Sequence, residues 1–253
     1  MAASCRAARA SEASQVVKFS RAQLQQLRHR HRGYRISLGC EVLLLLLLPL
    51  AHQMPWLLSA QLIGLAVALV VFVSRFSVLK TGRPLIIALG SLAVLFELLW
   101  HGALRFHPAL GQLLTLPHMV VWTLFLLVAV VRTVKALIRE PYVTVAVVLG
   151  AASGYLLVGI AGGVLLTALW MMHPTAFDPS ALPPFAATLA NPVPMAPALM
   201  VAAFGLLTTV GTGVLSPSNV SGQVAAAVIT IAGQLYVAIL IALILGRFHR
   251  RSL

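Results

Sequence analysis

Six long apolar runs dominate this sequence, and they constrain its fold more than any other feature. They cover about residues 36–53, 56–76, 84–104, 116–134, 143–172 and 222–246. About 20 apolar residues of helix cross the hydrocarbon core of a bilayer. Hydrophobic residues make up 60% of the chain and charged residues only 9%, which is far from the balance of a soluble domain. The sequence therefore predicts an all-α integral membrane protein with six transmembrane helices.

The basic residues lie between these runs and indicate how the chain is oriented. They form four clusters, which lie before residue 38, after the second run, after the fourth run and after the sixth, and only Arg105 lies elsewhere. Six crossings put all four clusters on one face, which the positive-inside rule makes cytoplasmic. We therefore expect both termini in the cytoplasm, with residues 1–35 as a basic tail on anionic lipid headgroups.

A net charge of +13 also brings nucleic acid into consideration as a binding partner. The basic tail carries no recognised binding motif and no aromatic residues at stacking intervals. We expect no nucleic-acid partner.

The segment between the fifth and sixth runs differs from the rest of the chain. Residues 173–197 are rich in proline and hold no basic residue, which predicts an outer loop. Residues 198–208 are apolar but too short to cross a bilayer, and a stretch rich in Gly, Thr, Ser and Pro follows. Irregular backbone at membrane depth survives only beside protein or water. We therefore expect a re-entrant pore helix and loop between the fifth and sixth helices.

This pattern divides the chain into two membrane parts after the tail. Residues 36–137 form a four-helix domain, and residues 138–253 form a pore domain. Within the pore domain we expect an outer helix at 143–172, a pore helix at 198–208, a filter at 209–213 and an inner helix at 222–246.

The stretch that follows the short apolar segment carries the chemistry. It reads Thr209-Val210-Gly211-Thr212-Gly213. Potassium channels replace the hydration shell of the ion with backbone carbonyls from four T-V-G-Y-G loops. Glycine suits such a loop because aiming successive carbonyls at one axis needs backbone angles that a side chain resists.

Residues 140–246 resemble the pore of bacterial two-helix-pore potassium-type channels, and four further stretches carry that resemblance. They are Tyr155-Leu156-Leu157-Val158-Gly159, Pro174-Thr175-Ala176-Phe177, Ser216-Pro217 and Gly233-Gln234-Leu235-Tyr236-Val237-Ala238. The resemblance implies a homotetramer in a bacterial inner membrane that conducts cations, most of all potassium. It implies no organic cofactor, because K⁺ is the permeant ion.

The resemblance also implies roles for individual residues. The carbonyls of Thr209, Val210, Gly211 and Thr212 would coordinate K⁺, with Gly213 completing the filter. Thr208, Phe204 and Val214 would support the filter from behind. Gly233 falls where related inner helices bend during gating, and a close-packing role is an equal alternative.

The filter departs from the family at two places. Thr212 stands where the family has an aromatic residue, and Val214 stands where it has an acid. Since both normally hold the carbonyl ring at its working diameter, we expect weaker discrimination between potassium and sodium.

The sequence also bears on functions other than a channel. A voltage sensor needs basic residues at every third place of the fourth run, and residues 116–131 hold none. An enzyme needs converging acids, bases or metal ligands, and no such motif is evident, so we expect none. A non-selective cation channel, a transporter and a non-conducting subunit stay as alternatives, although only the second half has a broken helix.

Two acids and a set of glycines lie within the runs. Glu97 and His101 are four residues apart, which predicts a polar pair near the outer end of the third helix, with an ion or proton path as the alternative. We expect Glu41 to pair with basic loop residues. The glycines between 150 and 163 permit close helix packing, within one subunit or between subunits.

Overall fold

The computed structural model describes residues 21–76, 82–139, 144–178, 195–211 and 216–249. Within these ranges the chain is helical except for short connections and one isolated β-bridge. Five of the described helices are long and apolar enough to span a membrane. Residues 179–194 of the predicted outer loop lie outside the described residues, as do the predicted filter residues Thr212 and Gly213 and the predicted supporting residue Val214.

The helices follow the apolar runs in order. They are α2 (Arg21–Leu46), α3 (Leu48–Gln53), α4 (Pro55–Val71), the π-helical turn η1 (Phe72–Phe76), α5 (Arg83–Phe106), α6 (Pro108–Arg139), α7 (Val145–Met172), the 3₁₀ turn η2 (Pro174–Ala176), α8 (Met195–Leu207) and α9 (Val220–His249). The second to sixth predicted spans each correspond to one of the five long apolar helices.

The first predicted span, residues 36–53, is the exception. Its helix begins at Arg21, inside the predicted basic tail, and is interrupted at Leu47 before α3 resumes. The interruption follows from Pro49, which has no N–H to donate to the carbonyl four residues earlier and whose ring crowds that carbonyl. The run is therefore two helical segments, and it is not among the five helices long and apolar enough to span a membrane.

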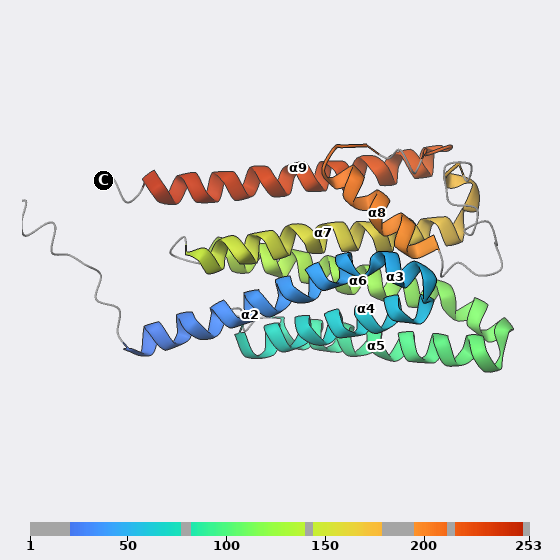
Figure 1. Ribbon diagram of the computed structural model, residues 1–253, viewed down its shortest axis with the longest axis horizontal. Coiled ribbons are helices and arrows are strands. Elements are labelled where there is room, and N and C mark those ends of the chain that lie inside the picture. The colour runs from blue at the N-terminus through green and yellow to red at the C-terminus, as the bar shows by residue number, and fades with distance from the viewer. Residues whose placement is uncertain (1–20, 77–81, 140–143, 179–194, 212–215, 250–253) are drawn as a thin grey trace, which may run out of the picture.

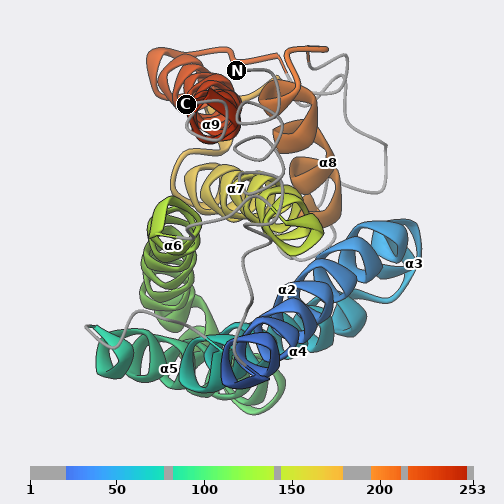
Figure 2. The same ribbon diagram turned by 90° about the vertical axis from the view of Figure 1, so that its left-hand side faces the viewer.

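The long helices lie side by side along one axis, and α7 occupies the middle. Figure 1 shows α9 on one edge of the molecule and α4 with α5 on the opposite edge. In the end-on view of Figure 2, α7 lies between the group formed by α8 and α9 and the group formed by α2, α4, α5 and α6. In their most apolar stretches, 61% of α7 but only 22% of α9 is buried.

Buried side chains form two clusters that meet on α7. One joins α2, α4, α5, α6 and α7 around Trp122, Phe125 and Leu65. The other joins α7, α8 and α9 around Leu166, Leu199 and Leu207. Because α7 faces both clusters, its packing decides how the two groups of helices fit together.

The glycines of α7 let its neighbours approach closely. A Cβ on Gly163 would lie 2.8 Å from the Cα of Met200 in α8, and one on Gly159 would overlap the ring of Phe204. A Cβ on Gly154 would meet the Tyr236 hydroxyl of α9. Of the two packing alternatives, these three glycines therefore serve contacts within the chain.

We predict that Gly163→Ala destabilises the protein by about 1–3 kcal/mol, because the new methyl group must push the backbone of α8 away from α7. Gly64→Ala is the matched control, since nothing lies within 4 Å of a Cβ at Gly64, and it should not destabilise the protein, because alanine is a better helix former than glycine by up to about 1 kcal/mol. Unfolding in detergent measures both. Equal effects of the two substitutions would contradict the close α7–α8 contact.

Candidate functional site

The short helix α8 ends about halfway along its two long neighbours. Tyr155 of α7 donates a hydrogen bond from its hydroxyl to the carbonyl of Leu207, the last residue of α8, at 3.3 Å. Tyr155 lies ten residues after the start of α7, or about 15 Å at 1.5 Å per residue. Gly233, against which Leu207 packs, lies thirteen residues into α9, or about 20 Å. Figure 1 shows α8 running obliquely from one end of the bundle toward its middle.

The backbone leaves α8 in an uncommon conformation. Thr209 has a φ of 59° and Gly211 a φ of 87°, both in the left-handed region. Glycine adopts such angles freely, but a β-branched residue does so at a cost of order 1–3 kcal/mol. Strain of this kind persists only where the surroundings hold it, and it gathers at functional sites.

Hydrogen bonds tie this segment back to its own helix. The N–H of Thr209 donates to the carbonyl of Leu206 at 3.1 Å, and the N–H of Gly211 donates to that of Gly205 at 3.3 Å. In a planar trans peptide the carbonyl points opposite to the N–H. The carbonyl of Val210 is therefore turned away from α8. The Val210 side chain is 85% exposed in the single chain.

The chain on the far side of this segment is anchored to the exit of α7. Phe177 and Pro217 form the isolated antiparallel bridge. The N–H of Asp178 donates to the carbonyl of Ser216 at 2.9 Å, and the N–H of Ser218 donates to that of Ala176 at 3.0 Å. Two of the stretches quoted for the resemblance, 174–177 and 216–217, are thus brought together.

Two tyrosines from the other quoted stretches also meet. The ring centroids of Tyr155 and Tyr236 are 5.9 Å apart. The Tyr236 hydroxyl donates to the Ala151 carbonyl at 2.7 Å, while Tyr155 bonds the end of α8. The two tyrosines of the quoted stretches therefore connect α7 to the end of α8 and to α9.

Thr208 and Phe204, predicted to support the filter, and Gly233, predicted as a hinge or a packing site, are placed as follows. Thr208 follows α8 and donates from its hydroxyl to the Phe204 carbonyl at 2.8 Å. The Phe204 ring lies over Gly159 of α7. Gly233 lies in an unbroken stretch of α9, where a Cβ would be 2.6 Å from the Leu207 carbonyl oxygen. Close packing is thus a definite role for Gly233.

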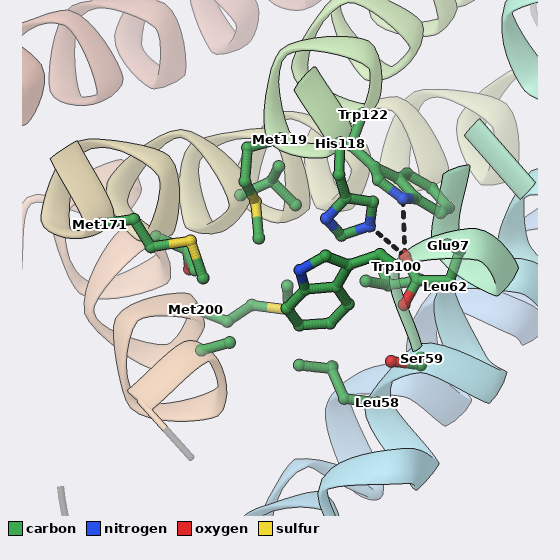
Figure 3. Close-up of a pocket in the computed structure, with 13 residues that line it drawn as sticks. Leu58, Ser59, Leu62, Glu97, Trp100, His118, Met119, Trp122, Met171 and Met200 are labelled. Carbon is green, nitrogen blue, oxygen red and sulfur yellow. Dashed lines mark hydrogen bonds and ion pairs between the residues drawn. The ribbon is translucent and has the colours of Figure 1, made fainter. Parts of the chain in front are cut away.

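A second polar group surrounds Glu97 in α5. Its Oε2 lies 2.6 Å from His118 Nε2 and accepts a hydrogen bond from Trp122 Nε1 at 2.7 Å. The predicted partner His101 lies 3.5 Å from Oε1, and its Nε2 is 2.6 Å from the Ser59 hydroxyl. Figure 3 shows His118 and Trp122 converging on the carboxylate. Glu97 is buried, so the pair expected from the sequence is one part of a larger enclosed cluster.

Glu41 is the second buried acid, and the expectation that it pairs with basic loop residues is wrong. Its Oε1 accepts hydrogen bonds from Ser37 at 3.1 Å and from Ser153 of α7 at 2.9 Å. Its side chain is fully buried because α2 packs along α7. Hydroxyl groups, and not cations, therefore bond one oxygen of this carboxylate, Oε1, while the buried Oε2 has no hydrogen-bond partner among the described residues.

Sequence reasoning missed the roles of His118, Trp122 and Ser59. A signal was available for the first two, since His118 and Trp122 are four residues apart and so share one face of a helix. Which face of α6 meets Glu97 depends on the packing between helices, and no local sequence pattern reveals that packing.

Comparison with protein-family models, with curated proteins and with solved structures gives no match for this chain. The resemblance of residues 140–246 to channel pores therefore rests on the motifs quoted above.

We predict that Thr209→Gly raises stability by about 0.5–1 kcal/mol, because glycine removes the left-handed strain at this position. Thr208→Gly is the control. It should lower stability by about 1 kcal/mol, since it removes the hydroxyl that donates to the Phe204 carbonyl. Thermal unfolding in detergent compares the two. A loss of stability in Thr209→Gly as large as that in Thr208→Gly would show that Thr209 is not strained.

Proposed function

We propose that this protein is a tetrameric cation channel of the inner membrane, with potassium as its main permeant ion. Four chains would surround one axis, and each would contribute the segment that begins at Thr209. In this proposal α7 is the outer helix, α8 the re-entrant pore helix and α9 the inner helix of the pore.

One observation carries the proposal: irregular backbone lies halfway along helices long enough to span a membrane, and it is exposed in the single chain. Thr209, Val210 and Gly211 are all exposed. Lipid cannot satisfy peptide groups, and such backbone is tolerated at membrane depth only inside protein or beside a water-filled cavity. Further copies of the chain around an aqueous path would place this backbone between protein and water.

The conformation of the segment supports carbonyl coordination. Left-handed angles at Thr209 and Gly211, two residues apart, turn the Val210 carbonyl away from α8 while the N–H groups stay bonded to it. A backbone carbonyl is the ligand with which potassium channels replace water. In the proposed assembly these carbonyls face the axis.

The surface of α9 supports assembly around that axis. This helix packs mainly against α7 and α8, and its other side exposes apolar residues such as Val228, Ile231 and Leu235. In a tetramer part of that side would pack against neighbouring subunits and part would line the inner cavity.

The test is current through purified protein in a planar bilayer. Gly211→Ala is the informative variant, because nothing lies within 4 Å of a Cβ there and only the backbone angle opposes the change. We expect discrete current steps from the wild type and at least tenfold smaller current from Gly211→Ala, with unchanged expression and oligomeric mass. Gly39→Ala, also with open space around its Cβ, is the matched control and should conduct normally.

Three results would contradict the proposal. They are a monomer or dimer in native mass measurements, slow saturable flux in place of current steps, and full current in Gly211→Ala. The second of these would favour a transporter.

We further predict a reversal potential between the potassium and sodium equilibrium values when the two ions are placed on opposite sides of the bilayer. The reason is that Thr212 and Val214 replace the aromatic and acidic residues of the resembled filter. A potential that follows potassium alone would show that these replacements leave selectivity intact.

A further inference from the structure

His118 presents a ring nitrogen that the fold leaves without a partner. Its Nδ1 is buried and makes no hydrogen bond, and the side chain is 3% exposed. The other nitrogen, Nε2, faces the Glu97 carboxylate at 2.6 Å. An ionised carboxylate only accepts hydrogen bonds, so a neutral His118 carries its proton on Nε2 and has a lone pair on Nδ1. Native proteins seldom bury such a group without a partner.

The lone pair faces a cavity bordered by sulfur. The cavity has a volume of about 40 Å³ and is lined by His118, Met119, Met171 and Met200 among others. Three of the six methionines in the described part of the chain thus border one small space. Figure 3 shows the unpaired nitrogen of His118 turned toward the space that these three side chains surround. They come from α6, α7 and α8.

We propose that this cavity binds a soft monovalent metal ion, Cu⁺, through His118 Nδ1 and the thioether sulfurs of the surrounding methionines. Thioethers select soft ions of this kind, and neutral imidazole is a common ligand of copper. A metal-bound histidine usually donates its other N–H to a carboxylate, which fixes the ring and its tautomer. Glu97, itself held by Trp122, stands in that position.

Other occupants fit the cavity less well. It is far smaller than the roughly 150 Å³ that holds a benzene-sized ligand. Hard cations and zinc need several oxygen, nitrogen or thiolate donors. Among the described residues no group of three His, Cys, Asp or Glu side chains gathers to hold a metal. A buried water needs two to four polar partners, and the Thr167 hydroxyl in the lining could only accept from it, because its proton is donated to the Gly163 carbonyl.

The experiment titrates Ag⁺, a redox-stable ion of the same class, into purified full-length protein in chloride-free detergent. Apart from ions bound by cysteine thiols, we expect one tight site per chain by calorimetry. Met171→Leu should weaken binding at least tenfold while keeping the packing, because leucine and methionine are similar in volume. Met172→Leu is the matched control, since Met172 is the next residue of α7 and is half exposed, and it should bind as the wild type does. His118→Ala should abolish the site.

Cys5 and Cys40 offer thiols that also bind Ag⁺, so a Cys5→Ser/Cys40→Ser variant belongs in every titration. Retention of the single site in this variant supports the proposal, and its loss overturns it. Equal affinities of the Met171→Leu and Met172→Leu variants, or no binding by folded wild type, overturn it as well. Binding is measured without current, so failure here is distinct from failure of the proposed channel.

Discussion

The fold depends on ending a helix halfway along its neighbours. The last carbonyls of any α-helix have no partner within the helix, and α8 ends where apolar side chains surround it. The Tyr155 hydroxyl bonds the Leu207 carbonyl, and Gly233 leaves room for that carbonyl against α9. The close approach of α8 in turn requires Gly159 and Gly163 in α7. Small residues on two long helices thus accommodate one short helix.

Two buried carboxylates fix the remaining helices around α7. Glu41 joins α2 to α7 through Ser153, and Glu97 joins α5 to α6 through His118 and Trp122. Between helices in lipid, the hydrophobic effect gives little preference for one face over another, so packing and interhelical hydrogen bonds set the contacts. The hydrogen bonds of the two acids therefore determine which helix faces meet.

The sequence predicted the parts of this fold that depend on length and hydropathy. Five of the six apolar runs were located, because helices of that length follow from composition alone. Two helix boundaries were predicted wrongly because the effect of a proline was misjudged. Pro49 divides the first run, whereas Pro197 does not end a loop but lies in the first turn of α8, where a missing N–H costs nothing. The partners of Glu97 and Glu41 were missed because they lie on other helices, and a helical period cannot show which faces meet.

The support of the segment after α8 bears on how selective such a pore can be. In the resembled channels an aromatic ring and an acid brace the filter from behind. Here the one aromatic side chain of α8, Phe204, is used to pack on Gly159 of α7. The described part of the segment is held instead by hydrogen bonds from Thr209 and Gly211 into α8. These bonds fix the position of the first residues of the segment. They do not set the diameter of the proposed ring of carbonyls. In the proposed channel, a ring of carbonyls held in this way would adapt its diameter to more than one cation. The contact between Phe204 and α7 is thus a second reason, beside Thr212 and Val214 in the sequence, to expect looser selectivity.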